Sequence, residues 1–341
     1  MPDSISVDSP PGFAPEAFER YAYPRTLDPR MVEILAQQRA AAAPVDRYAL
    51  PFDQARALLL QERRKSQTGV PRMLAIEDAE LQVNGRRVGL RWYRPQASRD
   101  AVPIVYLHGG GWCVGSNETH DTVLRHLAAG SGLPVCGVDY SLAPEHPFPA
   151  ALADVAGAVD AVLAQHGRVV LAGDSAGANL ALVEAMRRRD ARPAAGDADA
   201  DGIAGLILFY GVFGPMRSGG SFGAYGSGEF GLSCAAQQRY LDAYLSGASN
   251  TDDPRAFPLL GELGGLSPAL ILAAGLDLLL DDSVRMHHAI VAAGGRSTLS
   301  VAHGVPHGFL NHANALPRAA QALAEAASFA RSLIERRPAQ S

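Results

Sequence analysis

The feature that most constrains the fold of this 341-residue chain is an alternation of short β-rich runs with longer segments that can form helices. The runs are PIVYLHG, PVCGVDY, RVVLAGD, GLILFYG, ALILAAG and STLSVAHG, and helix-capable segments separate most of them. Apolar strands that alternate with helices are typical of a mostly parallel sheet with helices on both faces. The sequence therefore predicts an α/β fold.

Segments outside this alternation predict further elements. PRMVEILAQQRAAA and PFDQARALLLQERRKS carry apolar residues at helical spacing and begin with proline, which favours two helices. MLAIEDAELQV and RRVGLRWYRP flank Asn84-Gly85, a dipeptide typical of tight hairpins, so two more strands are expected. Residues 1–20 show no periodicity and predict a loose tail. A Gly-rich stretch followed by a helical pattern at 214–247 is too long for a simple connection.

Composition narrows the possible partners of the chain. With 48% hydrophobic and 19% charged residues and a net charge of -5, the chain lacks the basic excess of nucleic-acid-binding proteins. Cys113, Cys136 and Cys234 have no CxxC spacing, so neither a disulfide framework nor a zinc site is expected. No apolar run reaches the roughly 18 residues of a membrane helix, and the first residues lack a signal-peptide pattern. We expect a cytoplasmic protein with no membrane insertion, no nucleic-acid partner and no metal or organic cofactor.

The pentapeptide GDSAG places Ser175 between two glycines where a predicted strand meets a predicted helix. The glycines permit a tight bend that would lift the hydroxyl above the sheet, and the helix N-terminus directs positive potential at it. A serine that only caps the helix is the alternative interpretation. To act as a nucleophile the hydroxyl needs a base, and the base needs an acid to orient it.

Residues after later strands could complete such a set. Asp277 follows the run ALILAAG, and His303 and His307 follow the next run, which is the chain order expected for the acid and the base. Three consecutive glycines at 109–111 follow the run PIVYLH. Because glycine has no side chain, their amides can approach the oxygen of a reacting carbonyl, and the amide of Ala176 would add a donor.

Together these segments closely resemble the bacterial hormone-sensitive lipase family of esterases, which have the α/β-hydrolase fold. The resemblance covers about residues 75–335 and rests on HGGGW at 108–112, DYSLAPEHPFPAAL at 139–152, GDSAG at 173–177, AGLDLLLDD at 274–282 and HGF at 307–309. It implies a mostly parallel, eight-stranded sheet with helices on both faces and a helical cap. In this family the catalytic histidine precedes Gly-Phe, which selects His307 over His303.

The resemblance implies a serine carboxylesterase that hydrolyses short- to medium-chain acyl esters through an acyl-enzyme. Ser175 would attack the ester carbonyl, His307 would transfer the proton and Asp277 would hold the imidazole. The implied oxyanion hole comprises Gly109, Gly110, Gly111 and Ala176, with Gly109 shaping the loop. An amidase, carbamate hydrolase or lactonase on the same triad stays open, as does a ligand-binding protein that has lost turnover.

The resemblance also implies how the chain divides. The expected parts are a loose tail at 1–20, N-terminal cap helices at 21–66, core at 67–211, a cap insertion at 212–247 and core at 248–341. The cap would line a pocket for a small-molecule ester, with expected lining from Phe18, Tyr21, Tyr23, Trp112, Phe213, Phe222, Tyr225 and Phe230. Family members often dimerise through the last strand and helix, so a homodimer through 296–335 is expected.

Overall fold

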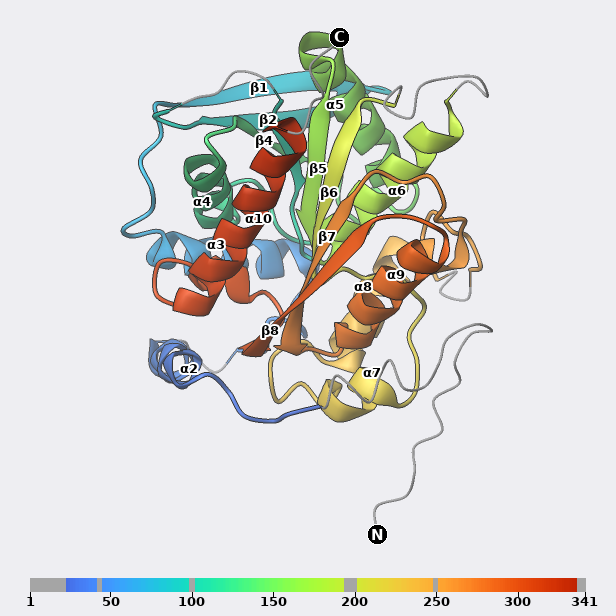
Figure 1. Ribbon diagram of the computed structural model, residues 1–341. Coiled ribbons are helices and arrows are strands. Elements are labelled where there is room, and N and C mark those ends of the chain that lie inside the picture. Colours follow the sequence, from blue (N-terminus) through green and yellow to red (C-terminus); the bar gives the residue numbers. More distant parts are fainter. Residues whose placement is uncertain (1–22, 42–44, 98–101, 193–200, 248–250, 336–341) are drawn as a thin grey trace.

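The architecture is a single twisted sheet in a computed structural model that describes residues 23–41, 45–97, 102–192, 201–247 and 251–335. The predicted tail at 1–20, and Phe18 and Tyr21, lie outside the described residues. The strands are β1 (Ala75–Val83), β2 (Arg86–Arg94), β3 (Ile104–Leu107), β4 (Val135–Asp139), β5 (Val169–Asp174), β6 (Ile203–Phe209), β7 (Ala269–Leu276) and β8 (Ser297–Pro306). Their order in the sheet is β1-β2-β4-β3-β5-β6-β7-β8 (Figure 1). The predicted eight-stranded sheet is confirmed.

Strand direction follows the sequence pattern. β2 runs antiparallel to β1 and to β4, and the pairs from β4 through β8 are parallel. Every residue of β3, β5, β6 and β7 is buried, as expected where helices cover both faces of a parallel sheet. Asn84 and Gly85 join β1 to β2 with φ values of 50° and 77°, the positive values that a tight hairpin turn requires.

The helices form a layer on each face of the sheet (Figure 1). α4 (Asp121–Ser131) and α10 (Pro317–Glu335) pack on one face, where their alanines and leucines join one buried apolar cluster. α5 (Ala150–His166), α6 (Ala176–Asp190) and α9 (Leu280–Ala292) cover the opposite face and belong to a second cluster. In the described part of the chain, the helices are too short or too polar to span a bilayer.

Further helical elements lie near the carboxyl ends of the parallel strands. They are α2 (Pro29–Ala41), α3 (Phe52–Ser66), α7 (Gly220–Tyr225), α8 (Cys234–Tyr244) and the short 3-10 turns η1 (Pro258–Leu260) and η2 (Phe309–His312). Two segments far apart in sequence meet here, because Arg239 on α8 donates to the carbonyls of Tyr48 and Leu50. The division of the chain into cap and core at the predicted boundaries stays a prediction.

Two sets of contacts fix these segments to the rest of the chain. Arg56 on α3 donates to the Cys113 carbonyl at 2.7 Å and to both oxygens of Glu145 at 2.9 and 2.6 Å. At the start of α9, the Asp282 carboxylate accepts from the amides of Phe213 and Gly214, both at 2.9 Å. The orientation of α3 is therefore set by one partly buried and two exposed hydrogen bonds of Arg56, and the path of the insertion by two buried ones to Asp282.

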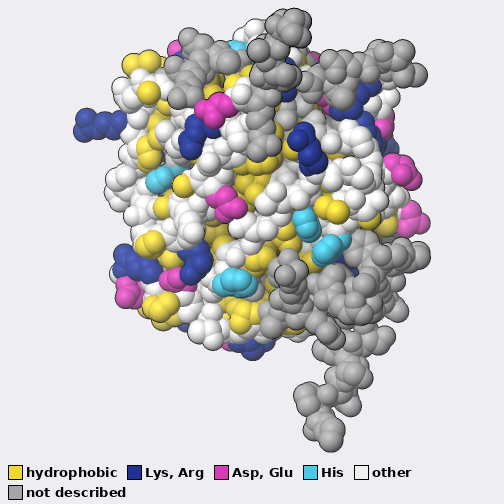
Figure 2. Space-filling view, viewed as in Figure 1, with side chains coloured by type: hydrophobic (Ala, Val, Ile, Leu, Met, Phe, Trp, Pro, Cys, Tyr) yellow, Lys and Arg dark blue, Asp and Glu magenta, His cyan; other side chains and the backbone are white. Residues whose placement is uncertain are grey.

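The surface carries both signs of charge. On the face in Figure 2, arginines and lysines lie among aspartates and glutamates without gathering into one basic area. Ion pairs between adjacent strands add to this mixture, as Arg91 with Asp78 and Arg94 with Glu77 join β2 to β1. Exposed pairs of this kind contribute little to stability, roughly 0–1 kcal/mol each.

Candidate active site

Ser175 lies at a sharp bend between β5 and α6. Its backbone has φ 55° and ψ -118°, a conformation that non-glycine residues rarely adopt. A Cβ on Gly177 would lie 1.9 Å from the Leu107 carbonyl oxygen, and one on Gly173 would lie 2.4 Å from the Gly177 carbonyl oxygen. The flanking residues must be glycine because a side chain would push α6 off the sheet. The Ser175 side chain makes no capping hydrogen bond to α6. The alternative interpretation, a serine that only caps the helix, therefore does not match the structure.

Three side chains from separate strand ends form a hydrogen-bonded chain. The Ser175 Oγ lies 2.9 Å from His307 Nε2, and His307 Nδ1 lies 2.6 Å from Asp277 Oδ2. Because a carboxylate can only accept, the Nδ1 proton points to Asp277 and Nε2 is left to accept from the serine hydroxyl. His303 is exposed on β8, so the structure selects His307 between the two histidines.

The glycine loop after β3 has no room for side chains. A Cβ on Gly110 would lie 2.0 Å from the Val114 carbonyl oxygen, and one on Gly111 would lie 2.4 Å from the Tyr240 ring. The Gly109 amide donates to Asp174 at 2.8 Å. By contrast, the amides of Gly110, Gly111 and Ala176 make no hydrogen bond to any described residue. Three of the four predicted oxyanion-hole residues therefore keep a free amide donor, whereas the amide of Gly109 is bound to Asp174.

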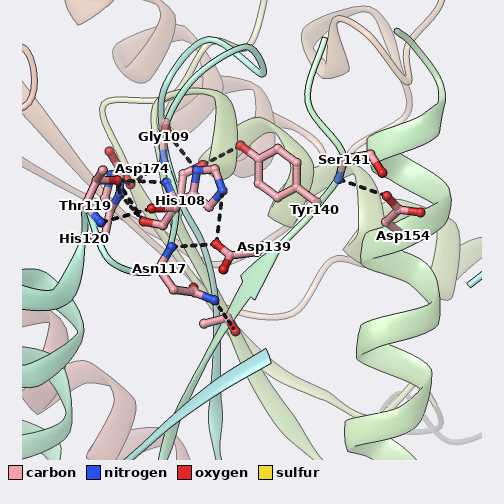
Figure 3. Close-up of polar contacts among 12 residues, drawn as sticks. His108, Gly109, Asn117, Thr119, His120, Asp139, Tyr140, Ser141, Asp154 and Asp174 are labelled. Atoms are coloured by element: carbon pink, nitrogen blue, oxygen red, sulfur yellow. Dashed lines mark hydrogen bonds and ion pairs between the residues drawn. The ribbon is translucent and has the colours of Figure 1, made fainter. Parts of the chain in front are cut away.

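Asp174 anchors this loop from beneath (Figure 3). Its carboxylate is 4% exposed and accepts from the Tyr106 hydroxyl at 2.7 Å and from Gly109, with His120 Nε2 at 3.3 Å. Burial alone would raise the pKa of Asp174, but His120 and the two hydrogen bonds outweigh it and lower the pKa to about 2. Asp174 is therefore a carboxylate at neutral pH and holds the first glycine of the loop by its amide.

His108 holds Gly109 by its carbonyl group (Figure 3). Its Nδ1 lies 2.9 Å from the Gly109 carbonyl oxygen, and its ring stacks on Tyr140 at 4.4 Å between centroids. Burial, together with nearby His120, lowers the pKa of His108 to about 3. The ring is thus neutral at physiological pH and donates from Nδ1. Gly109 is fixed at both its amide and its carbonyl, so the loop is held rigidly next to Ser175.

A cavity of about 120 Å³ lies in front of Ser175 and His307. Its wall includes the glycine loop, residues of the 45–50 turn and α3, and residues of the insertion that carries α8. The lining residues from these last segments are Arg47, Tyr48, Ala55, Leu59, Arg63, Gly231, Leu232, Gln237 and Tyr240. Within the described ranges, no three His, Cys, Asp or Glu side chains gather as they would around a metal ion.

The aromatic residues expected to line the pocket lie elsewhere. Trp112 is fully buried and stacks on Tyr244 at 4.3 Å between centroids. Phe213, Phe222 and Tyr225 are buried in the apolar cluster around α9 and do not line this cavity. Tyr23 and Phe230 likewise pack against Tyr225. Burial of these large apolar side chains among themselves is favourable. The wall is formed instead by a mixture of apolar residues, such as Leu59 and Tyr240, and polar or charged residues, such as Arg63 and Gln237.

Sequence reasoning missed Arg47, Arg63 and Gln237. A signal was present for Arg63, because Ala55, Leu59 and Arg63 are spaced by four residues and therefore share one face of α3. Ala55 and Leu59 are buried, so that face points inward and Arg63 continues it. No comparable pattern in the sequence distinguishes Arg47 or Gln237.

Known proteins with a similar sequence and structure identify the family of this chain. The sequence model of a family described as having the alpha/beta hydrolase fold matches residues 104–311. A hyperthermophilic esterase from the archaeon Pyrobaculum calidifontis is 31% identical, with 91% of this chain and 99% of that chain covered and a TM-score of 0.82. EstE1, a thermophilic carboxylesterase from a metagenomic library, is 30% identical over 85% of this chain and 99% of its own, with a TM-score of 0.79.

Proposed function

The chain belongs to the α/β-hydrolase-fold family, among its hormone-sensitive-lipase-like esterases, and we propose that it hydrolyses short- to medium-chain carboxylic esters through an acyl-enzyme on Ser175. One observation carries the proposal. The hydrogen-bonded chain Ser175–His307–Asp277 opens on a cavity beside the free amides of the glycine loop. This combination supplies a nucleophile, a base, an orienting acid and donors for an oxyanion.

These positions support the following mechanism. The Ser175 Oγ attacks the ester carbonyl carbon as its proton passes to His307 Nε2, and Asp277 stabilises the imidazolium. The carbonyl oxygen becomes an oxyanion that the amides of Gly110, Gly111 and Ala176 bind. The carbon–oxygen bond to the alcohol breaks as His307 returns the proton to the leaving oxygen. Water then attacks the acyl-serine with His307 again as base, which releases the acid and restores Ser175.

A matched ester and amide test the proposed reaction. We expect p-nitrophenyl butyrate to be hydrolysed at least about 100-fold faster, in kcat/KM, than butyryl-p-nitroanilide, because an amine is a poorer leaving group and must be protonated before it departs. Release of p-nitrophenol and of p-nitroaniline is followed by absorbance. Faster cleavage of the anilide would contradict the ester assignment and favour an amidase, and no cleavage of either would contradict hydrolysis on this triad.

The size of the cavity predicts a short acyl chain. A volume of about 120 Å³ corresponds to about four water molecules. We therefore expect kcat/KM to be highest between p-nitrophenyl acetate and butyrate and to fall at least roughly tenfold at octanoate, since added methylenes must displace packed side chains. Rates for the acetate-to-laurate series at fixed detergent concentration check this expectation. A maximum at octanoate or beyond would show that the cavity does not limit the acyl group.

The glycine loop yields a prediction with an internal control. Gly111→Ala is expected to lower kcat by about 100-fold, because its Cβ would meet the Tyr240 ring and displace an oxyanion donor. Gly85→Ala introduces the same positive-φ strain at the β1–β2 turn, where nothing lies within 4 Å of the added Cβ. Steady-state kinetics and thermal unfolding separate the two effects: both variants lose stability, and only Gly111→Ala loses turnover. Equal kcat in both would argue against the loop as the oxyanion site.

The homodimer also remains a proposal. β8 is the last strand of the sheet, and an edge strand can pair with a second copy, although its Gly304 carbonyl already accepts from the Asp28 amide. Light scattering across a range of concentrations tests it: a mass near twice 35.9 kDa supports the dimer, and a monomer mass throughout contradicts it.

A further inference from the structure

Two arginines reach the cavity that contains Ser175. Arg47 comes from the turn before α3, and Arg63 comes from the last turns of α3. Arg63 continues the inward face of the helix that Ala55 and Leu59 begin, and Arg56 fixes that helix on the core. The next residue, Arg64, differs because its side chain is 60% exposed and pairs with Glu118. The cationic group at the cavity is therefore set by helix geometry and is not part of a general basic surface.

The wall of the cavity has more positive than negative groups. Among its described lining residues, the arginine, histidine and carboxylate side chains are Arg47, Arg63, His120, Asp174 and His307, and the tyrosines are Tyr48 and Tyr240. Asp174 is the one carboxylate in that set, and its charge is already used by Tyr106, Gly109 and His120. Glu62, which is 42% exposed, lies 3.4 Å from Arg47, and both Glu62 and Asp174 act electrostatically on Arg63. The described lining itself offers a ligand two guanidinium groups and one carboxylate.

The charge of Arg63 is costly where it lies. Burial, and then the neighbouring charge of Arg47, lower the pKa of Arg63 to about 10, which still leaves the guanidinium protonated at neutral pH. Two like charges in a partly desolvated site repel each other, and an anion between or beside them would relieve that repulsion. Guanidinium groups bind carboxylates with strong, charge-assisted hydrogen bonds.

Gln237 on α8 adds a further donor to the cavity wall. It is 2% exposed. Its side-chain nitrogen has no hydrogen-bond partner among the described residues. A buried donor without a partner costs free energy, and an acceptor atom of a ligand would remove that cost.

We propose that the preferred substrate is an ester that carries a carboxylate, which Arg63 and Arg47 bind, assisted by Gln237, while Ser175 attacks the ester group. This inference rests on the proposed function, because it assigns the substrate class of the same site. The carboxylate belongs either to the acyl part, as in a half-ester of a dicarboxylic acid, or to the alcohol part, as in an acylated hydroxy acid. The chemistry of recognition is the same in both cases.

Matched pairs of esters test the proposal at both ends of the substrate. The acyl-side pair is mono-p-nitrophenyl adipate and p-nitrophenyl hexanoate, which have equal carbon number and differ by the carboxylate. The alcohol-side pair is 4-acetoxybenzoate and its neutral methyl ester. For each pair the charged-to-neutral ratio of kcat/KM is measured, with the reaction without enzyme subtracted. In at least one pair we expect this ratio to exceed one for the wild type and to fall as NaCl is added, because salt screens the arginines.

Variants identify the arginine responsible. Arg63→Gln is expected to lower the charged-to-neutral ratio by roughly tenfold or more, and Arg63→Lys to restore part of it, since a lysine keeps the charge without the planar fork. Arg64→Gln, one residue along the same helix and directed to solvent, is the matched control and leaves the ratio unchanged. A ratio is used because a general loss of folded enzyme would lower both rates alike.

The outcomes separate this inference from the proposed function. A ratio above one that depends on Arg63 in either pair supports the inference and locates the carboxylate on that side of the ester. Hydrolysis of neutral esters with ratios at or below one in both pairs, or ratios equal in wild type and Arg63→Gln, overturns the inference and leaves the esterase proposal standing. Failure to hydrolyse any of the four esters overturns the proposed function itself.

Discussion

Replacing Ser175 by alanine is expected to lower kcat for p-nitrophenyl butyrate by roughly 10⁴- to 10⁶-fold. The variant removes the oxygen that would attack the ester and form the acyl-enzyme, whereas the oxyanion donors and cavity stay in place. The methyl group of alanine fits the space of the hydroxymethyl group, so the urea midpoint of unfolding should change little. Turnover is measured by p-nitrophenol release with enzyme at high concentration, so that trace wild-type contamination can be bounded.

A second buried serine is the control for this variant. Ser131 lies at the end of α4, is 2% exposed and donates to the Leu127 carbonyl at 2.6 Å. Ser131→Ala is expected to lose stability, by about 1 kcal/mol for the lost hydrogen bond, and to keep kcat within about threefold of the wild type. If Ser175→Ala retained more than about one hundredth of the wild-type kcat, the nucleophile would have to be another group.

Asp277→Asn is expected to lower kcat by about 10⁴-fold. The asparagine keeps the size of the side chain but can donate to His307 Nδ1, which would then carry no proton and leave the proton on Nε2. In that tautomer His307 cannot accept from the Ser175 hydroxyl. The measurement is kcat across pH 6–9, and the rate should rise with hydroxide as the neutral-pH base is lost.

A variant of a nearby carboxylate, Asp281, is the control that distinguishes a loss of catalysis from a loss of stability. Asp281 lies one turn further along, where it accepts from the Ser221 amide and from the Tyr23 hydroxyl, both at 2.9 Å. Asp281→Asn is expected to lower the thermal midpoint while its kcat stays within about tenfold of the wild type. Comparable losses of kcat in the two variants would mean that Asp277 acts by supporting the fold and not by orienting His307.

The strands and the reactive side chains could be predicted because local patterns determine them. The positive φ values of Asn84 and Gly85 match the hairpin turn that this dipeptide predicts. Apolar runs such as ALILAAG form buried strands, as predicted. Parallel strands bring their carboxyl ends to one edge of the sheet. Ser175, Asp277 and His307 each follow such an end, so their meeting follows from topology once the order of the strands is known.

The wall of the pocket could not be predicted, because it depends on contacts between distant segments. Phe213 and Tyr225 are expected from the sequence to line the pocket, but both are buried in the apolar core, where Tyr225 packs against Tyr23 and Phe230. Arg63 is not among the residues expected from the sequence to line the pocket, and the docking of α3 through Arg56 brings it to the cavity.

The glycine loop at 109–111 could likewise not be predicted in full from the sequence. Three glycines in a row supply three amides, and no local rule tells which of them are committed elsewhere. In the structure Gly109 is held by Asp174, and Asp174 is held in turn by His120, one of ten histidines in the sequence. Such a buried network joins residues from three separate segments, so it becomes visible only when the segments are placed together.

Covalent labelling of Ser175 is the most direct test of the proposed nucleophile. The enzyme is exposed to diethyl p-nitrophenyl phosphate, digested and analysed by mass spectrometry, with residual activity measured in parallel. We predict one diethylphosphoryl group per chain, on the peptide that contains Ser175, with activity lost in proportion to the label and far slower labelling in His307→Ala. A label on any other residue, or full labelling of Ser175 with activity retained, would contradict Ser175 as the catalytic nucleophile.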